Sequence, residues 1–191
     1  VKWQGGEVFL YEKFEELLDE CIKNKVPQFI QTNGLLLNEK FLNKCLKNNI
    51  WLSFSIDAVK KETYEQIRLG AKFDSLIEKL KLLKKYKQSN EDFKYSMLMV
   101  VMSLNYKQIV DAVNFAIEYG FSAVSFQQYV PYVNKELSLN RKQTEEVIEQ
   151  IKILKQKSLN NSIPIEILTD ISLNEIFVDT KLKEKQEFND N

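Results

Sequence analysis

Short apolar segments alternate with longer amphipathic ones along most of this 191-residue chain, and this alternation limits the folds it can adopt. Segments with the length and composition of strands lie near residues 1–4, 28–33, 51–57, 94–104, 122–128 and 163–168. Segments with helical periodicity lie near residues 11–24, 38–48, 61–69, 73–87, 107–119 and 140–157. Repeated strand–helix units of this length predict an α/β fold, with parallel strands in the sheet and helices outside it.

Capping residues agree with these helix positions. Asn38 suits the start of the second helix, Gly120 the end of the fifth, and Asn140 with Gln143 a capping box. No internal repeat or linker divides the chain, so we expect one domain over residues 1–170. Residues 171–191 are charged and end without periodicity, which predicts a C-terminal helix or tail that is partly disordered.

Composition excludes several kinds of site and partner. The chain has no histidine, which rules out histidine-based triads and histidine-ligated metals within it. Its 27 basic and 27 acidic residues balance, so no net charge attracts nucleic acid or an anionic membrane. No apolar run reaches the length of a membrane span and no signal peptide is visible, which makes a cytoplasmic location the expectation.

The two cysteines, Cys21 and Cys45, lie far apart in sequence and form no CxxC pair. Each belongs to an apolar stripe with helical spacing. We therefore predict that both are buried core thiols, rather than metal ligands or a disulfide.

Polar residues occur toward the ends of several predicted strands. In segment 51–57, Ser53, Ser55 and Asp57 alternate with apolar residues and share one face. The same pattern occurs at three other strands. Gln31 and Asn33 belong to segment 28–33, and Ser125 and Gln127 belong to segment 122–128. In segment 94–104, one face carries Tyr95, Met97, Met99 and Val101 and continues to Ser103 and Asn105. On a common face they would gather at the C-terminal strand ends, where α/β proteins build ligand sites. Alternatively, they satisfy backbone groups near those ends.

A glycine pair and a carboxylate, Gly5-Gly6-Glu7, follow the first predicted strand. Because glycine has no Cβ, backbone at such a position can approach a ligand closely. Glu7 could then face a cationic group of that ligand. The alternative is that the glycines only form a turn between strand and helix.

Four blocks of the sequence together resemble the core of the radical S-adenosylmethionine (radical SAM) enzyme family. They are Gly5-Gly6-Glu7, Thr32-Asn33-Gly34, Ser55-Ile56-Asp57-Ala58, and the stretch from Tyr64 to Phe73 that contains Arg68. Within the family, the chain resembles the subgroup that includes peptide-modifying and sulfatase-maturing (SPASM-type) enzymes, over residues 1 to about 130 and toward 170. One departure is Val8, where family members usually carry proline. The resemblance implies a partial (β/α)6 TIM-like barrel without the first βα unit.

The resemblance also implies a SAM site. The carbonyls of Gly5 and Gly6 and the Glu7 carboxylate would accept hydrogen bonds from the ammonium of SAM. Arg68 would bind its carboxylate bidentately, which lysine does less well, although a solvated helix arginine is the alternative. Ser55 and Asp57 would face the ribose or methionine part. Weaker candidates for cofactor or substrate contacts are Asn33, Asn105, Phe126 and Gln127, of which Phe126 could instead belong to the core.

For a complete family member, the resemblance implies reductive cleavage of SAM at a [4Fe–4S] cluster. The resulting 5′-deoxyadenosyl radical would abstract a hydrogen from a substrate, here a peptide or protein, and an electron donor would be a partner. The CxxxCxxC loop that holds the cluster in the family is missing, so the expectation is a partial domain that is inactive alone.

Two other functions stay open at this point. One is a cluster-less, radical-SAM-like scaffold that binds SAM, a nucleotide or a partner protein without radical chemistry. The other is a hydrolase or aldolase barrel using Glu7, Asp57 and a lysine. This last interpretation is weaker, because no lysine falls on an inward strand face near those carboxylates.

Overall fold

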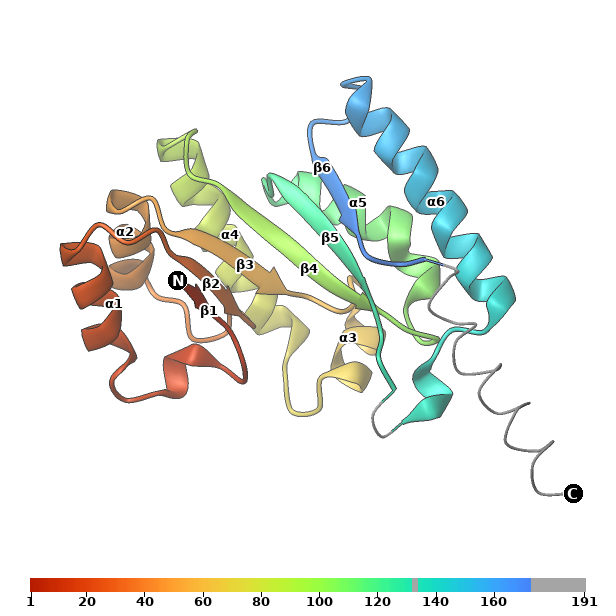
Figure 1. The fold of residues 1–191 in the computed structure, drawn as a ribbon, viewed down its shortest axis with the longest axis horizontal. Coiled ribbons are helices and arrows are strands. Elements are labelled where there is room, and N and C mark those ends of the chain that lie inside the picture. The colour runs from red at the N-terminus through yellow and green to blue at the C-terminus, as the bar shows by residue number, and fades with distance from the viewer. Residues whose placement is uncertain (132–133, 173–191) are drawn as a thin grey trace, which may run out of the picture.

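The computed structural model describes residues 1–131 and 134–172, and these residues form one open sheet of six parallel strands (Figure 1). The strands are β1 (Lys2–Trp3), β2 (Phe29–Thr32), β3 (Trp51–Ser55), β4 (Tyr95–Val101), β5 (Ala123–Gln128) and β6 (Glu166–Thr169). Each pairs in parallel with the next one along the chain. The predicted α/β class is therefore confirmed, while the tail predicted over 171–191 lies outside the described residues from 173 onward.

Helices connect successive strands, as the amphipathic segments predict. They are α1 (Phe14–Lys23), α2 (Glu39–Lys47), α3 (Lys61–Ile67), α4 (Phe73–Ser89), α5 (Ile109–Glu118) and α6 (Arg141–Leu159), with short 3₁₀ helices η1 (Val8–Leu10), η2 (Tyr106–Gln108) and η3 (Lys135–Leu137). Asn38 caps α2, and Asn140 with Gln143 forms the capping box of α6, as predicted. The fifth predicted helix is shorter than expected, because its first turn is the 3₁₀ helix η2.

The strand order explains why the helices lie on one side of the sheet. The order β1 to β6 never reverses, and right-handed crossovers between parallel neighbours then place every helix on the same face. In Figure 1, α4 and α5 accordingly lie behind the strands. Side chains on the helix side, such as Leu52, Phe54 and Met97, are fully buried. This is the arrangement of a partial TIM-like barrel, in which the other sheet face is the inner one.

The strand register corrects one prediction about this inner face. In the ladder, Phe54 pairs with Met97, whereas Ser55 pairs with Leu98. The residues Tyr95, Met97, Met99 and Val101 therefore face the helices and do not share a face with Ser55. Gln31, which pairs with Ser53, does lie on the inner face, as predicted. So do Ser125 and Gln127, which pair with Leu98 and Val100.

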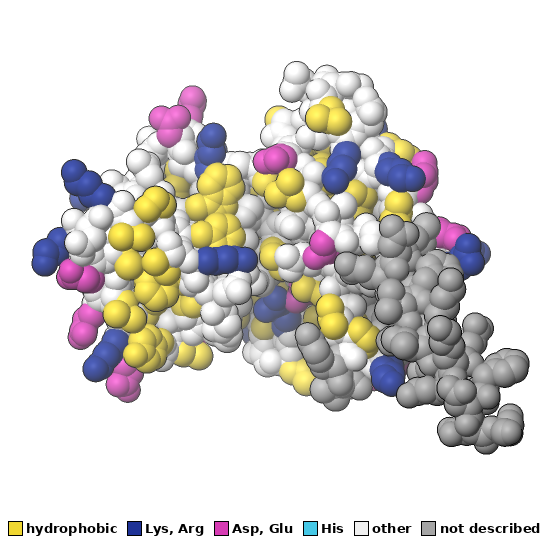
Figure 2. Space-filling view, viewed as in Figure 1, with side chains coloured by type: hydrophobic (Ala, Val, Ile, Leu, Met, Phe, Trp, Pro, Cys, Tyr) yellow, Lys and Arg dark blue, Asp and Glu magenta, His cyan; other side chains and the backbone are white. Residues whose placement is uncertain are grey.

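The inner face combines apolar and polar side chains along the strands. Phe29 and Trp51 pair with each other near the N-terminal strand ends, and both are half-buried. The Trp51 indole donates to the Ser96 hydroxyl at 3.2 Å. Figure 2 shows hydrophobic side chains gathered in the left half of this view, over α1 and the first strands. The polar residues of β2 and β3 lie toward the opposite, C-terminal strand ends.

Close packing fixes the end of β2, where the site residues follow. Gly34 has a φ of 80°, and a Cβ there would lie only 2.9 Å from Cδ1 of Phe54. Phe54 in turn packs edge-on against Tyr95 and Phe121, with ring centroids 6.1 and 5.8 Å away. Glycine is thus required at position 34 for both backbone conformation and space.

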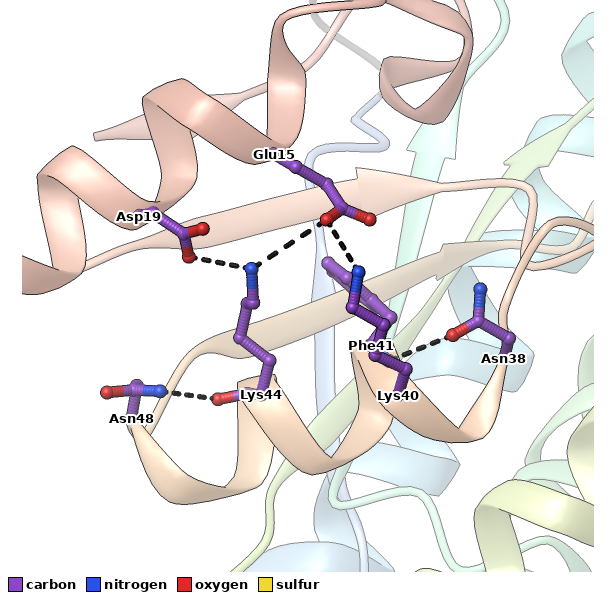
Figure 3. A network of polar contacts seen from close by, with 7 residues as sticks. All are labelled: Glu15, Asp19, Asn38, Lys40, Phe41, Lys44 and Asn48. Carbon is purple, nitrogen blue, oxygen red and sulfur yellow. Dashed lines mark hydrogen bonds and ion pairs between the residues drawn. The ribbon is translucent and has the colours of Figure 1, made fainter.

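Ion pairs tie α1 to α2 on the outside of the sheet (Figure 3). Lys44 contacts Asp19 at 2.6 Å and Glu15 at 3.9 Å, and Lys40 contacts Glu15 at 3.0 Å. Lys44 is the least exposed member of this group, with 20% of its side chain accessible. Most of these side chains face solvent, so the network orients the two helices more than it stabilises the fold.

The cysteines bear out the prediction only in part. Cys45 is fully buried, but Cys21 is half-buried, because it lies nearer the edge of the apolar stripe of α1. Both are free thiols. Within residues 1–131 and 134–172, no helix combines the length and apolarity needed to cross a membrane.

Candidate functional site

A polar cleft of about 330 Å³ lies at the C-terminal ends of β1, β2 and β3. Its lining consists of Gly5, Gly6, Glu7, Gln31, Thr32, Asn33, Ser55 and Arg68. Six of the ten predicted site residues therefore line one cleft: Gly5, Gly6, Glu7, Asn33, Ser55 and Arg68. The sequence prediction did not assign Gln31 and Thr32 to the site. Two features of the sequence indicate them: Gln31 alternates onto the same strand face as Asn33, and Thr32 directly precedes Asn33.

The loop after β1 exposes its backbone to the cleft. Gly5 and Gly6 have φ values of 102° and 59°, in the left-handed region that favours glycine. A Cβ built at either residue would meet no atom within 4 Å. The glycines therefore serve the backbone conformation and leave open space beside the peptide groups.

The Glu7 carboxylate connects this loop to the end of β2. Its Oε1 accepts a hydrogen bond from Oγ1 of Thr32, and its Oε2 accepts one from the backbone N–H of Asn33, both at 2.8 Å. Its Oε1 also accepts from the backbone N–H of Phe9 at 3.4 Å. A carboxylate offers about four acceptor positions, so these three bonds leave capacity for a cationic ligand. The contacts fix the position of the negative charge at the cleft wall.

The turn after β2 and the neighbouring strand complete this wall. Oδ1 of Asn33 accepts from the backbone N–H of Leu35 at 2.9 Å, and Oγ1 of Thr32 accepts from that of Gly34 at 3.0 Å. Across the strands, Gln31 donates to the Ser55 hydroxyl at 3.3 Å. These local bonds stabilise the turn and orient Asn33 and Ser55 at the cleft.

Arg68 supplies the positive charge of the cleft from the C-terminal end of α3. Its Nη2 lies 2.7 Å from Oδ2 of Asp57, and their side chains are 24% and 10% exposed. Its buried Nε has no hydrogen-bond partner among the described residues. Asp57, predicted to face a ligand directly, does not line the cleft; it lies against Arg68 instead.

Arg68 also borders a second hollow of about 420 Å³ on the side of the α3–α4 turn. Tyr64 and Asn33 line this hollow as well, so the two spaces share Asn33 and Arg68. The Tyr64 hydroxyl is buried without a partner among the described residues. Burial raises the pKa of this phenol, and the nearby Arg68 charge partly opposes that rise. Arg68 therefore has unsatisfied polar groups around it as well as an ion-pair partner.

The remaining three predicted residues lie outside the cleft. Asn105 is fully buried, and its amide donates to the carbonyls of Asp57 and Val100 at 2.6 and 2.8 Å. Its Oδ1 accepts from the Met102 N–H at 2.8 Å. Both donor hydrogens are used, so the structure gives Asn105 a role in holding strand ends, in place of the predicted ligand contact.

Phe126 and Gln127 occupy opposite faces of β5. Phe126 is fully buried in the core under the helices, so its side chain offers no surface to a ligand. Gln127 is half-buried on the inner face beside Val100. It lies on the same face as Ser55, but it is not part of the cleft lining.

The thiols of this chain do not fit an iron–sulfur cluster. A [4Fe–4S] cluster needs thiolate ligands, and the sequence has two cysteines, on separate helices. Burial raises the pKa of Cys45, which opposes formation of a thiolate there. Among residues 1–131 and 134–172, no group of three or more histidine, cysteine, aspartate or glutamate side chains could hold a metal ion.

Several proteins of known structure share this fold. SuiB of Streptococcus suis, in a crystal structure bound to precursor peptide SuiA, has a TM-score of 0.72 and 20% identity over 89% of this chain and 38% of its own. The anSMEcpe structure with bound AdoMet and the Cp18Cys peptide has a TM-score of 0.67 and 22% identity, covering 87% of this chain and 49% of that one. A domain of pyruvate-formate lyase-activating enzyme from Bacteroides vulgatus has a TM-score of 0.64 and 14% identity, over 88% of this chain and 97% of that domain.

Sequence comparison gives the family. The uncharacterized protein MJ0907 of Methanocaldococcus jannaschii is 25% identical over 146 residues, which are 73% of this chain and 49% of that protein. The chain thus spans about half the length of this curated relative and a smaller share of SuiB. The model of the radical SAM superfamily matches residues 1–116, which is more than half of the chain. The chain therefore belongs to the radical SAM superfamily.

Proposed function

We propose that the cleft at β1, β2 and β3 binds S-adenosylmethionine, as the SAM-binding part of a radical SAM enzyme. The observation that carries this proposal is the meeting of the Gly5-Gly6 backbone, the Glu7 carboxylate and the Arg68 guanidinium in one polar cleft. SAM has an ammonium and a carboxylate at its methionine end. The cleft presents one group of opposite charge for each of them.

The hydrogen-bond donors and acceptors of SAM match those of the cleft. An ammonium only donates, and the Glu7 carboxylate and exposed backbone carbonyls of the glycine pair can accept. A guanidinium only donates, and the SAM carboxylate accepts from Arg68. Ser55, at the end of β3, offers a hydroxyl that both donates and accepts. The chain's own residues thus bind and orient the methionine end of the cofactor.

A peptide or protein is the substrate class that we propose. Structures that share the fold include SuiB bound to a precursor peptide and anSMEcpe bound to AdoMet and a peptide. The subgroup resemblance seen in the sequence points the same way. The inner face of the sheet toward the C-terminal strand ends, where Gln127 is half-buried, is the surface of this chain on which such a substrate would lie.

A bound [4Fe–4S] cluster would supply the electron that cleaves SAM, but the residues of this chain do not fit its ligand set. We propose that the cluster thiolates come from cysteines outside this sequence, and that an electron-donor protein and a reducing, cytoplasmic environment are required. Anaerobic reconstitution of the 191-residue chain with iron and sulfide is expected to give no cluster absorbance. Stable cluster absorbance that disappears in a variant without Cys21 and Cys45 would contradict this part of the proposal.

The direct test of the proposed site is SAM binding by the 191-residue chain and by its Glu7→Gln variant. Glutamine keeps the size of the side chain but loses the charge that attracts the ammonium. We expect SAM to bind about tenfold more weakly, the effect of one charge-assisted hydrogen bond. Isothermal titration calorimetry measures it, and Glu12→Gln, at an exposed position outside the cleft, is the matched control. Equal SAM affinity in the Glu7→Gln variant and the unchanged chain would remove Glu7 from the site.

A cluster-less scaffold that binds SAM, a nucleotide or a partner protein without radical chemistry is the second candidate function. The cysteine content of the sequence favours it, because two thiols cannot provide three cluster ligands. SAM binding in the cleft is required by the first function and is compatible with the second. They differ in whether a natural protein containing this sequence binds a cluster when it is reconstituted anaerobically.

A further inference from the structure

The two oxygens of the Asp57 carboxylate contact different partners, one on strand β4 and the other on Arg68. Its Oδ1 accepts from the backbone N–H of Val100 at 3.0 Å, and its Oδ2 lies 2.7 Å from Nη2 of Arg68. Only 10% of the side chain is exposed, and it is not part of the cleft lining. Each oxygen thus already has a protein partner.

Asp57 is itself held firmly between β3 and β4. The buried Asn105 amide donates to its carbonyl at 2.6 Å, and the preceding Ile56 donates its N–H to the Leu98 carbonyl at 2.9 Å. These bonds connect the end of β3 to β4 and to the turn that follows it. The carboxylate is therefore a fixed point of the sheet.

The backbone of Arg68 is hydrogen-bonded to Tyr64 and Ala71, but among the described residues its side chain is held only by the ion pair with Asp57. Arg68 follows the last residue of α3, with φ −106° and ψ 80°, and its long side chain has high rotamer entropy in the free state. The ion pair with Asp57 is the contact that fixes the guanidinium in the cleft wall. Because Asp57 occupies Nη2, other N–H groups of the same guanidinium remain for a ligand carboxylate.

We propose that Asp57 is a positioning residue, which acts through Arg68 to give the cleft its preference for a ligand with a carboxylate. This inference rests on the proposed SAM site, and it replaces a direct contact between Asp57 and the cofactor. A negative charge behind the arginine could also repel the ligand carboxylate. SAM, however, has a net charge of +1 from its sulfonium, ammonium and carboxylate groups, so the long-range field of Asp57 does not oppose binding.

The test compares two ligands, SAM and 5′-methylthioadenosine, which has the adenosine part but no carboxylate. Asp57→Asn keeps the size of the side chain and an acceptor for the Val100 N–H, but it loses the ion pair. We expect SAM to bind about tenfold more weakly and 5′-methylthioadenosine to bind within about twofold of the unchanged chain. Asp170→Asn is the matched control, because Asp170 likewise accepts a backbone N–H, from Gln128 at β5.

A double-mutant cycle with Arg68→Met separates an effect through the arginine from a general field effect. We expect Asp57→Asn to cause no further loss of SAM affinity when Arg68 is already absent. An equal loss in both backgrounds, or an equal loss for both ligands, would overturn the positioning role. If the unchanged chain bound neither ligand, the proposed SAM site would fail first. Should Asp57→Asn not fold, Asp57→Glu displaces the charge, and the same comparison of ligands decides.

Discussion

Arg68→Ala is expected to weaken SAM binding by the 191-residue chain by about 100-fold. Two losses contribute to this effect. The variant removes the donors for the SAM carboxylate, and charged hydrogen bonds contribute about 1.5–3 kcal/mol. It also leaves the 10% exposed Asp57 carboxylate without its arginine, so that an uncompensated negative charge lies behind the position of the SAM carboxylate. Isothermal titration calorimetry at low ionic strength measures the change.

Two further variants test whether the effect is specific to position 68 and whether it depends on the shape of the guanidinium. Arg141→Ala removes the other arginine of the chain, which is 70% exposed at the start of α6, and we expect SAM affinity to stay unchanged. Arg68→Lys keeps the charge but loses the planar, bidentate geometry, so we expect an intermediate affinity. If lysine restored full affinity, the arginine would contribute only a point charge. If alanine had no effect, the carboxylate of SAM would lie elsewhere.

The strand and helix segments could be predicted from sequence because their patterns are local. Residues 51–57 alternate with period two, and the helical stripes repeat with period 3.6, so each element is visible within its own window. The single-face arrangement of helices then follows from parallel neighbours joined in chain order. The face of β4 was predicted wrongly, because register depends on pairing with β3. A shift of one residue there exchanges the two faces.

The same distinction explains which site residues could be predicted. Glu7, Asn33, Ser55 and Arg68 follow strand or helix ends in recognisable blocks, and they do line one cleft. The partner of a buried polar residue cannot be seen in one segment. Asp57 contacts an arginine eleven positions later, and Asn105 contacts a carbonyl 48 positions earlier. For Asn105, the simpler alternative of satisfying backbone groups at strand ends is the one that the structure supports.

Asn105→Ala is the stability prediction with the largest expected effect. The substitution removes the partner of three backbone groups: the buried N–H of Met102, the buried carbonyl of Asp57 and the partly buried carbonyl of Val100. Each unsatisfied buried group costs about 1–3 kcal/mol, and water entering the vacated space offsets a part. We therefore expect the free energy of unfolding to fall by about 3–4 kcal/mol, measured from urea denaturation at equilibrium.

Asn140→Ala is the matched control for this experiment. Asn140 also accepts a backbone N–H through its side chain, at 3.0 Å from Gln143, but it lies exposed at the N-cap of α6. Water can replace that bond, so we expect a loss of only about 1 kcal/mol. The difference between the two losses in free energy of unfolding measures how much burial adds to the loss of a side-chain hydrogen bond. Equal losses would mean that the link between the ends of β3 and β4 contributes no more than an ordinary helix cap, and Asn105 would again be open to a role at the ligand.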